Sequence, residues 1–231
     1  MQNIQAITID LDDTLWDIDP VIHRAETILW RWLASNYPRI SSIYDPEKIL
    51  NLRSEIAQEY PDKAFDYRFM RKLILRKIFR DADYEENLAE GAFAVFDKER
   101  NNVELYDGAL YTLKALTKKY TLIAITNGNA DLERIGLRHL FDDVVTAVEV
   151  GYAKPDERIF NEAIRKSGAE AQRILHVGDN PEADIVGAAN VGLTTVWINS
   201  KSLVWPDQFI KPDITINKIT ELCDLLLPEI N

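Results

Sequence analysis

The chain has 231 residues, 46% of them hydrophobic, and its 27 basic and 38 acidic residues give a net charge of −11. A chain this acidic repels nucleic acid and anionic membranes, so we expect neither as a partner. The single cysteine, Cys223, excludes an internal disulfide and a multi-cysteine zinc site. No signal-peptide pattern and no apolar run of about 20 residues is found, so a cytoplasmic protein is expected.

The first predicted element is a buried strand over residues 4–9, a short apolar run rich in β-branched side chains. Three carboxylates follow it directly: Asp10, Asp12 and Asp13. Strand alternation places Asp10 and Asp12 on one face, where two carboxylates repel unless a cation joins them or one holds a proton. A solvated acidic loop with Asp13 in a turn explains the same residues, and both hypotheses stay open on this stretch alone.

Residues 18–102 have helical periodicity and no strand signal. The pattern predicts four helices, which cover about residues 19–37, 45–60, 66–79 and 85–100. We therefore expect a small helical bundle inserted after the first strand. Residues 1–17 and 103–231 are expected to form the other domain.

From residue 106 onward, strand and helix signals alternate. Strands are predicted at 121–126, 144–148, 174–177, 193–198 and 214–216, and a helical pattern lies before or after each of them. The alternation indicates an α/β fold, with a Rossmann-like parallel sheet and helices on both faces.

Polar residues lie at the ends of three of the predicted strands, at Asp10, at Thr126 and at Asp179. Because the carboxyl ends of parallel strands meet at one edge of a sheet, we expect these side chains to converge there. Lys154 follows a fourth strand, and Asp184 lies on the first turn of the helix after Asp179. Acids and main-chain oxygens suit Mg²⁺, whereas a lysine and main-chain N–H groups suit a phosphoryl group.

Each of these residues has an ordinary structural explanation when it is taken alone. Thr126 fits a strand, Lys154 a solvated loop, Asp179 a turn that caps a helix, and Asp184 a surface acid near a helix start. Those explanations do not account for all four lying at one edge of the sheet.

Four short motifs, in this order, resemble those of the haloacid dehalogenase superfamily of phosphohydrolases. They are Asp10-Leu11-Asp12-Asp13-Thr14-Leu15, Ile125-Thr126-Asn127-Gly128, Lys154-Pro155, and Gly178-Asp179 with Asp184. The helical insert at 18–102 is similar to the cap that many members carry after the first motif. Residues 126–130 and 15–22 also resemble bacterial flavin mononucleotide phosphatases of this superfamily.

The resemblance implies a Mg²⁺-dependent phosphomonoesterase that acts through an aspartyl phosphate on a small phosphorylated metabolite. Flavin mononucleotide or a ribityl phosphate of the riboflavin pathway is a candidate substrate. It implies catalytic roles for Asp10, Asp12 and Lys154, and phosphate binding by Thr126, Asn127, Gly128 and Lys154. It also implies a metal site from Asp10, the main-chain carbonyl of Asp12 and Asp179, with Asp184 as a supporting residue.

Three alternatives share this fold. A sugar phosphomutase has the same four motifs, and a non-catalytic binding module could keep the fold without turnover. A hydrolytic dehalogenase needs no metal and lacks the second acid of the first motif, so Asp12 argues against it. Near the predicted cap edge, Trp16, Tyr44, Phe65 and Tyr67 either stack on a substrate ring or pack the interior. Both a monomer and a homodimer are compatible with the sequence.

Overall fold

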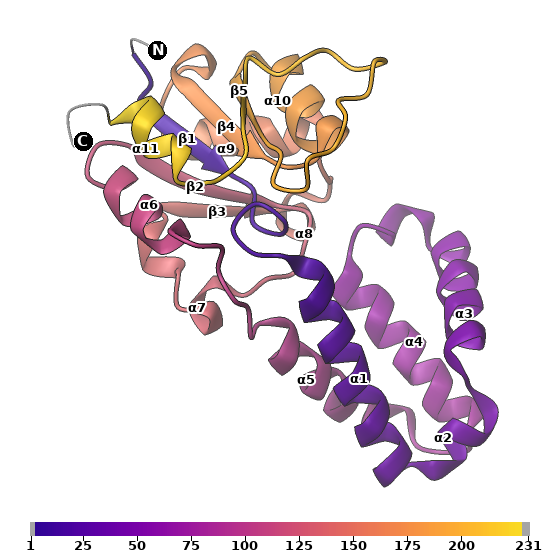
Figure 1. Ribbon diagram of the computed structural model, residues 1–231. Helices are drawn as coiled ribbons and strands as arrows, with labels where there is room; N and C mark the ends of the chain where they lie inside the picture. The colour runs from indigo at the N-terminus through magenta and orange to yellow at the C-terminus, as the bar shows by residue number, and fades with distance from the viewer. Residues whose placement is uncertain (1–2, 228–231) are drawn as a thin grey trace. The chain divides into compact units, whose positions relative to one another are not determined.

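The computed structural model describes residues 3–227, which divide into two units. The core unit contains the described residues up to Asp17 and from Glu104 onward, and the inserted unit is Ile18–Val103. Figure 1 labels helices α1–α11 and strands β1–β5.

A six-stranded sheet forms the centre of the core unit, in the order β3-β2-β1-β4-β5-β6 (Figure 1). All neighbouring strands run parallel, which confirms the predicted fold class. Every residue of β1 is buried, as expected for an apolar strand covered on both faces. The strands are β1 (Ala6–Ile9), β2 (Thr121–Thr126), β3 (Asp143–Thr146), β4 (Ile174–Gly178), β5 (Thr194–Ile198) and β6 (Ile214–Ile216).

The register aligns the carboxyl ends of the three middle strands. Ile9 at the end of β1 is level with Ala124 of β2 and with Val177 of β4. The ladder continues one residue further, because the Asp10 N–H donates to the Val177 carbonyl at 2.9 Å. The residues that follow β1, β2 and β4 therefore emerge at one edge of the sheet.

The helices of the core unit flank this sheet. They are α6 (Ala109–Leu116), α7 (Leu132–Ile135), α8 (Ala147–Val150), α9 (Glu157–Ser167), α10 (Gly187–Asn190) and α11 (Glu221–Leu226). Helix α9 packs against β2 and β3 and contacts α10, whereas α6 and α11 contact each other. No helix within residues 3–227 has the length and apolar character that crossing a bilayer demands.

Two elements of the core unit differ from the predictions. The predicted strand at 144–148 ends at Thr146, whose hydroxyl accepts the Glu149 N–H at 3.2 Å and so caps α8. The helix predicted after Asp179 begins as a π-helical segment, Pro181–Val186, and continues as the short α-helix α10. Side-chain capping, which periodicity does not report, decided the first of these boundaries.

The inserted unit is all-helical and has an apolar core of its own, to which the helices contribute Leu29, Ile40, Leu52, Ile74 and Phe96. Pro38 begins an additional short helix instead of only ending the first one, because proline is tolerated in a first helical turn. The helices are α1 (Ile18–Asn36), α2 (Pro38–Ile43), α3 (Pro46–Glu59), α4 (Tyr67–Asp81) and α5 (Ala89–Arg100).

Candidate active site

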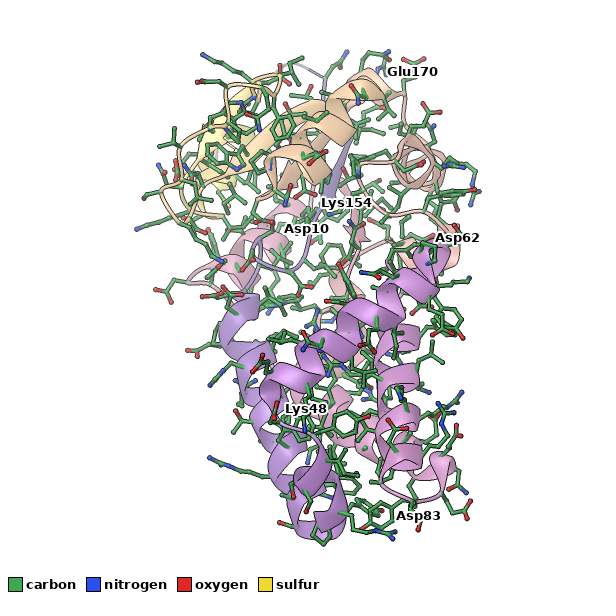
Figure 2. The ribbon with its side chains drawn as sticks, turned by 90° about the vertical axis from the view of Figure 1, so that its right-hand side faces the viewer. Asp10, Lys48, Asp62, Asp83, Lys154 and Glu170 are labelled. Atoms are coloured by element: carbon green, nitrogen blue, oxygen red, sulfur yellow. The ribbon has the colours of Figure 1, made fainter. Side chains whose placement is uncertain are left out.

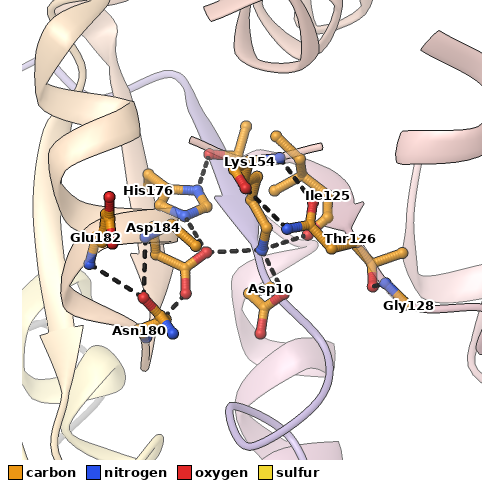
Figure 3. Close-up of polar contacts among 12 residues, drawn as sticks. Asp10, Ile125, Thr126, Gly128, Lys154, His176, Asn180, Glu182 and Asp184 are labelled. Atoms are coloured by element: carbon orange, nitrogen blue, oxygen red, sulfur yellow. Dashed lines mark hydrogen bonds and ion pairs between the residues drawn. The ribbon is translucent and has the colours of Figure 1, made fainter. Parts of the chain in front are cut away.

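Lys154 lies buried at the carboxyl edge of the sheet, close to Asp10 (Figure 2) and between the carboxylates of Asp10 and Asp184 (Figure 3). Its Nζ donates to Asp10 Oδ1 at 2.5 Å, to Asp184 Oδ1 at 2.6 Å and to the Ile125 carbonyl at 3.2 Å. These three bonds use all three donors of the ammonium group. Although burial alone lowers the pKa of Lys154, the charges of Asp10 and Asp184 outweigh it and raise that pKa. The lysine is therefore charged and held rigidly.

Three acids meet at this edge. Asp10, Asp179 and Asp184 each offer a carboxylate oxygen, and these oxygens lie within 4.8 Å of one another. Burial raises the pKa of Asp10 well above its ordinary value, and Asp184 and Asp179 add to this against the effect of Lys154. Burial and the charge of Asp184 likewise raise the pKa of Asp179 to about 7.

Three carboxylates lie beside a single ammonium group, so in their ionised forms they carry more negative charge than Lys154 neutralises. Asp184 differs from the other two: burial raises its pKa, but Lys154 and His176 outweigh burial, and the net shift is downward. A divalent cation fits the excess charge, the all-oxygen donors and their spacing. The donor set at this edge is thus compatible with the Mg²⁺ site that the sequence predicts.

Gly178 gives Asp184 the space it occupies. A Cβ atom at Gly178 would lie 2.3 Å from Asp184 Cγ, a distance that no side chain tolerates. Asp184 also accepts the Asn180 N–H through Oδ2 at 2.9 Å. The glycine before Asp179 is therefore explained by the approach of Asp184 to the strand end.

The loop after β2 holds the predicted phosphate-binding residues. The buried Thr126 Oγ1 accepts the Gly128 N–H at 2.9 Å, so its own hydroxyl hydrogen is left to reach another acceptor. The Asn127 side chain is bound to the main chain of Lys154 through both Oδ1 and Nδ2. The structure brings these three residues beside Lys154.

Asp12 is half-buried and lies outside the close group of three acids. Its Oδ1 accepts the indole N–H of Trp16 at 2.9 Å. The ring of Trp16 is fully buried, which places it in the interior and not on a surface where it could stack against a ligand. Lys201, which the sequence did not point to, donates to Asp13 Oδ1 at 3.1 Å.

The other aromatic candidates lie in the inserted unit. Tyr44 packs against its apolar core, and its hydroxyl donates to Asp81. Phe65 is half-buried, and Tyr67 is exposed. Of these three, Tyr67 is the side chain most available to a ligand.

Sequence reasoning missed two side chains that contact this site. The buried His176 of β4 lies 3.3 Å, through Nε2, from Asp184 Oδ1 (Figure 3). The indole N–H of Trp197, on β5, donates to the Asp179 main-chain carbonyl at 2.7 Å. A histidine inside an otherwise apolar strand, Ile-Leu-His-Val, was the signal available for the first.

The chain is similar to several known proteins. Residues 4–192 match the model of a protein family described as haloacid dehalogenase-like hydrolase. The 5-amino-6-(5-phospho-D-ribitylamino)uracil phosphatase YigB of Escherichia coli is 32% identical, over 96% of this chain and 96% of its own length. The pyrimidine 5'-nucleotidase YjjG of the same bacterium is 40% identical, over 52% of this chain and 55% of its own.

A solved structure is also closely similar. The crystal structure titled 2-haloacid dehalogenase from Pseudomonas syringae pv. Tomato DC3000 superimposes with a TM-score of 0.91 at 35% identity, covering 98% of this chain and 99% of that one.

Proposed function

The chain belongs to the haloacid dehalogenase-like hydrolases and is thus an enzyme, and from this premise we propose that it is a Mg²⁺-dependent phosphomonoesterase. The observation that carries the proposal is the position of Lys154 between Asp10 and Asp184, with Asp179 alongside. A buried lysine next to clustered acids is suited to bind a phosphoryl group beside a carboxylate nucleophile.

The chemistry follows from the chain's own residues. A carboxylate oxygen of Asp10 attacks phosphorus, the bond from phosphorus to the ester oxygen breaks, and an acyl phosphate forms on Asp10. Asp12 gives its proton to the departing alkoxide and then takes one from the water that hydrolyses the acyl phosphate. The Thr126 hydroxyl donates to a phosphoryl oxygen, and the buried positive charge of Lys154 stabilises the negative charge that accumulates on the phosphoryl oxygens in the transition state.

Asp10, Asp179 and the main-chain carbonyl of Asp12 would hold Mg²⁺, and Asp184 would support them or act as a further ligand. Bound there, the ion supplies positive charge that offsets the repulsion between the Asp10 carboxylate and the phosphate dianion. A calorimetric titration of chelator-treated protein with Mg²⁺ should show one site, and phosphate release should stop in chelator and return with Mg²⁺. Full activity in excess chelator would refute the metal requirement.

The inserted unit is proposed to be a cap that selects the leaving group. Support comes from the two connections to it, which run side by side in the core unit. Trp16 forms a bridge with Leu105, and the Tyr106 N–H donates to the Leu15 carbonyl at 2.9 Å. The first connection lies within a few residues of Asp12 and the second is paired with it, so a movement of the inserted unit would change the position of Asp12.

We propose further that the substrate has a ring and a flexible phosphorylated arm, as in a ribityl phosphate. The supporting observations are the local likeness to flavin mononucleotide phosphatases and the match to the ribitylaminouracil phosphatase along nearly its whole length. The test compares kcat/KM for phosphorylated ribitylaminouracil, flavin mononucleotide, pyridoxal phosphate, a pyrimidine nucleoside monophosphate and a sugar phosphate. A nucleotide or sugar phosphate preferred by more than tenfold, about 1.4 kcal/mol, would reject the ribityl class and leave the phosphatase standing.

A second candidate is a hydrolytic dehalogenase, because the solved structure at 35% identity is titled as one. Halide release from a 2-haloacid, measured beside phosphate release from an aryl phosphate, separates the two reactions. The three clustered acids favour the phosphatase, since a dehalogenase needs no cation at this edge. Halide release in chelator without phosphate release would reverse that preference.

A further inference from the structure

His176 lies inside β4, fully buried, between Thr8 and Asp184. Its Nδ1 is 2.8 Å from Thr8 Oγ1, and its Nε2 is 3.3 Å from Asp184 Oδ1. Thr8 and His176 are direct partners in the parallel register of β1 and β4. The contact between them is therefore set by the sheet itself and not by a loop.

The neighbours of His176 determine which nitrogen carries the hydrogen. Nε2 faces a carboxylate oxygen, which accepts hydrogen bonds when ionised, whereas Nδ1 faces a hydroxyl, which can donate. An unprotonated Nε2 would direct its lone pair at a carboxylate oxygen of Asp184. Nε2 is therefore assigned as the donor to Asp184, and Nδ1 accepts the hydroxyl hydrogen of Thr8.

Asp184 is thus held by donors from three different parts of the chain (Figure 3). Its Oδ1 accepts from Lys154 and His176, and its Oδ2 accepts the Asn180 N–H. Without the histidine, the carboxylate keeps one donor on each oxygen and can tilt about its last side-chain torsion. Because the Lys154 ammonium group is paired with Asp184, a tilt of the Asp184 carboxylate would also move that group relative to Asp10.

We propose that His176, oriented by Thr8, is a positioning residue: it fixes the Asp184 carboxylate so that Lys154 stays shared with Asp10 and the acids face one cation. The inference rests on the proposed function, because its consequences are read in Mg²⁺ binding and phosphate release. When a group that hydrogen-bonds to a residue of a metal site is removed, metal affinity or activity typically falls by about 10–100-fold.

A packing role is the competing explanation. The ring of His176 meets Phe160 edge to face, with centroids 5.3 Å apart and an interplanar angle of 85°. If packing were its only role, any substitution of similar volume would have the same effect. The test must therefore separate the loss of the ring from the loss of the donor.

Two amide substitutions separate them. In His176→Gln the side-chain amide nitrogen can take the place of Nε2 and donate to Asp184. In His176→Asn the shorter amide reaches the position of Nδ1 beside Thr8 and leaves Asp184 without that donor. Both remove the imidazole ring, so they are matched for loss of the contact with Phe160.

We expect His176→Asn to weaken Mg²⁺ binding, measured by calorimetry, by about tenfold and to lower kcat at saturating Mg²⁺ by about tenfold or more, with KM changed less than threefold. We expect His176→Gln to stay within about threefold of the wild type in both measurements. Equal losses in the two variants, with matching falls in melting temperature, would overturn the positioning role.

A measurement on the unaltered protein keeps the inference testable if His176→Asn does not fold. Long-range ¹H–¹⁵N correlation spectra report the tautomer of each of the three histidines. We expect the Nε2–H form for His176, and an Nδ1–H form would overturn the assigned bond to Asp184. If the wild-type protein neither binds Mg²⁺ nor releases phosphate, the proposed function is rejected, and this inference is rejected with it. If the wild type is active and the two variants are equally impaired, only the inference is rejected.

Discussion

Asn127 and Lys154 are joined by two hydrogen bonds between a side chain and a main chain. Asn127 Oδ1 accepts the Lys154 N–H at 2.7 Å, and Asn127 Nδ2 donates to the Lys154 carbonyl at 3.0 Å. The loop after β2 thereby fixes the backbone from which the Lys154 side chain extends toward Asp10. The Asn127 side chain thus positions the lysine, and the phosphate contact of Asn127 stays a prediction.

Asn127→Ala should therefore lower kcat by at least tenfold while the sheet stays folded. The loss of two hydrogen bonds also costs about 1–3 kcal/mol of stability, measured by denaturant unfolding. Asn161→Ala, on the exposed side of α9, is the matched control and should leave kcat unchanged. Unchanged kcat in Asn127→Ala would show that Lys154 is held adequately by its three side-chain bonds.

Asp10→Asn should lower kcat by several orders of magnitude, because an amide cannot form the acyl phosphate. In chelator its melting temperature should equal or exceed that of the wild type, since a neutral group replaces one of the clustered acids. Asp207→Asn, at an exposed loop position, serves as control for the loss of one charge. Turnover of Asp10→Asn within tenfold of the wild type would end the nucleophile assignment.

Gly178→Ala tests the approach of Asp184 to the strand end. The new methyl group would lie 2.3 Å from Asp184 Cγ, so Asp184 must move, and we expect kcat to fall at least a hundredfold. Gly91→Ala is the control, because its Cβ would lie 3.8 Å from the Trp32 ring, an ordinary contact. That helical substitution should retain activity and add about 0.5–1 kcal/mol of stability. A fully active Gly178→Ala would contradict the tight packing at this glycine.

Glu26 joins three helices of the inserted unit. It accepts hydrogen bonds from Arg53 and, at 2.8 Å, from Arg71, whose guanidinium lies 3.5 Å from the centroid of the Phe96 ring. Glu26→Gln leaves the largely buried Arg71 without its anion and should cost about 2–3 kcal/mol of the free energy of unfolding. Glu90→Gln, in an exposed group of ion pairs, should cost about 0–1 kcal/mol.

The pH dependence of stability should identify Glu26 as well. Burial alone raises the pKa of Glu26, but Arg71 and Arg53 outweigh burial and lower it from 4.5. The ionised form of Glu26 is therefore favoured in the folded state. Its contribution to the free energy of unfolding is complete above pH 4.5 and is lost as pH falls through the folded-state pKa of Glu26. Between neutral pH and pH 3, the wild type should thus lose more stability than Glu26→Gln. If the free energy of unfolding fell equally with pH in the wild type and in Glu26→Gln, the Glu26 carboxylate would contribute nothing to the pH dependence of stability.

The sequence by itself determined the order of the secondary-structure elements and the protein family. The apolar run at 4–9 and the alternation after residue 106 predict a parallel sheet with flanking helices, because side-chain periodicity reports which faces are buried. The four motifs, in order, indicated the hydrolase family, which the family match confirms. Element boundaries were less accurate, as at Thr146, because a single side-chain hydrogen bond decided where strand became helix.

Only the tertiary structure decided how the site is assembled. Asp10 and Asp184 come to share one ammonium group through the order and register of β1, β2 and β4, which a local pattern does not encode. The same register places Thr8 beside His176 and turns an apparently ordinary strand residue into a contact of the site. Periodicity describes neighbours along the chain, whereas these contacts depend on which distant strands become neighbours in space.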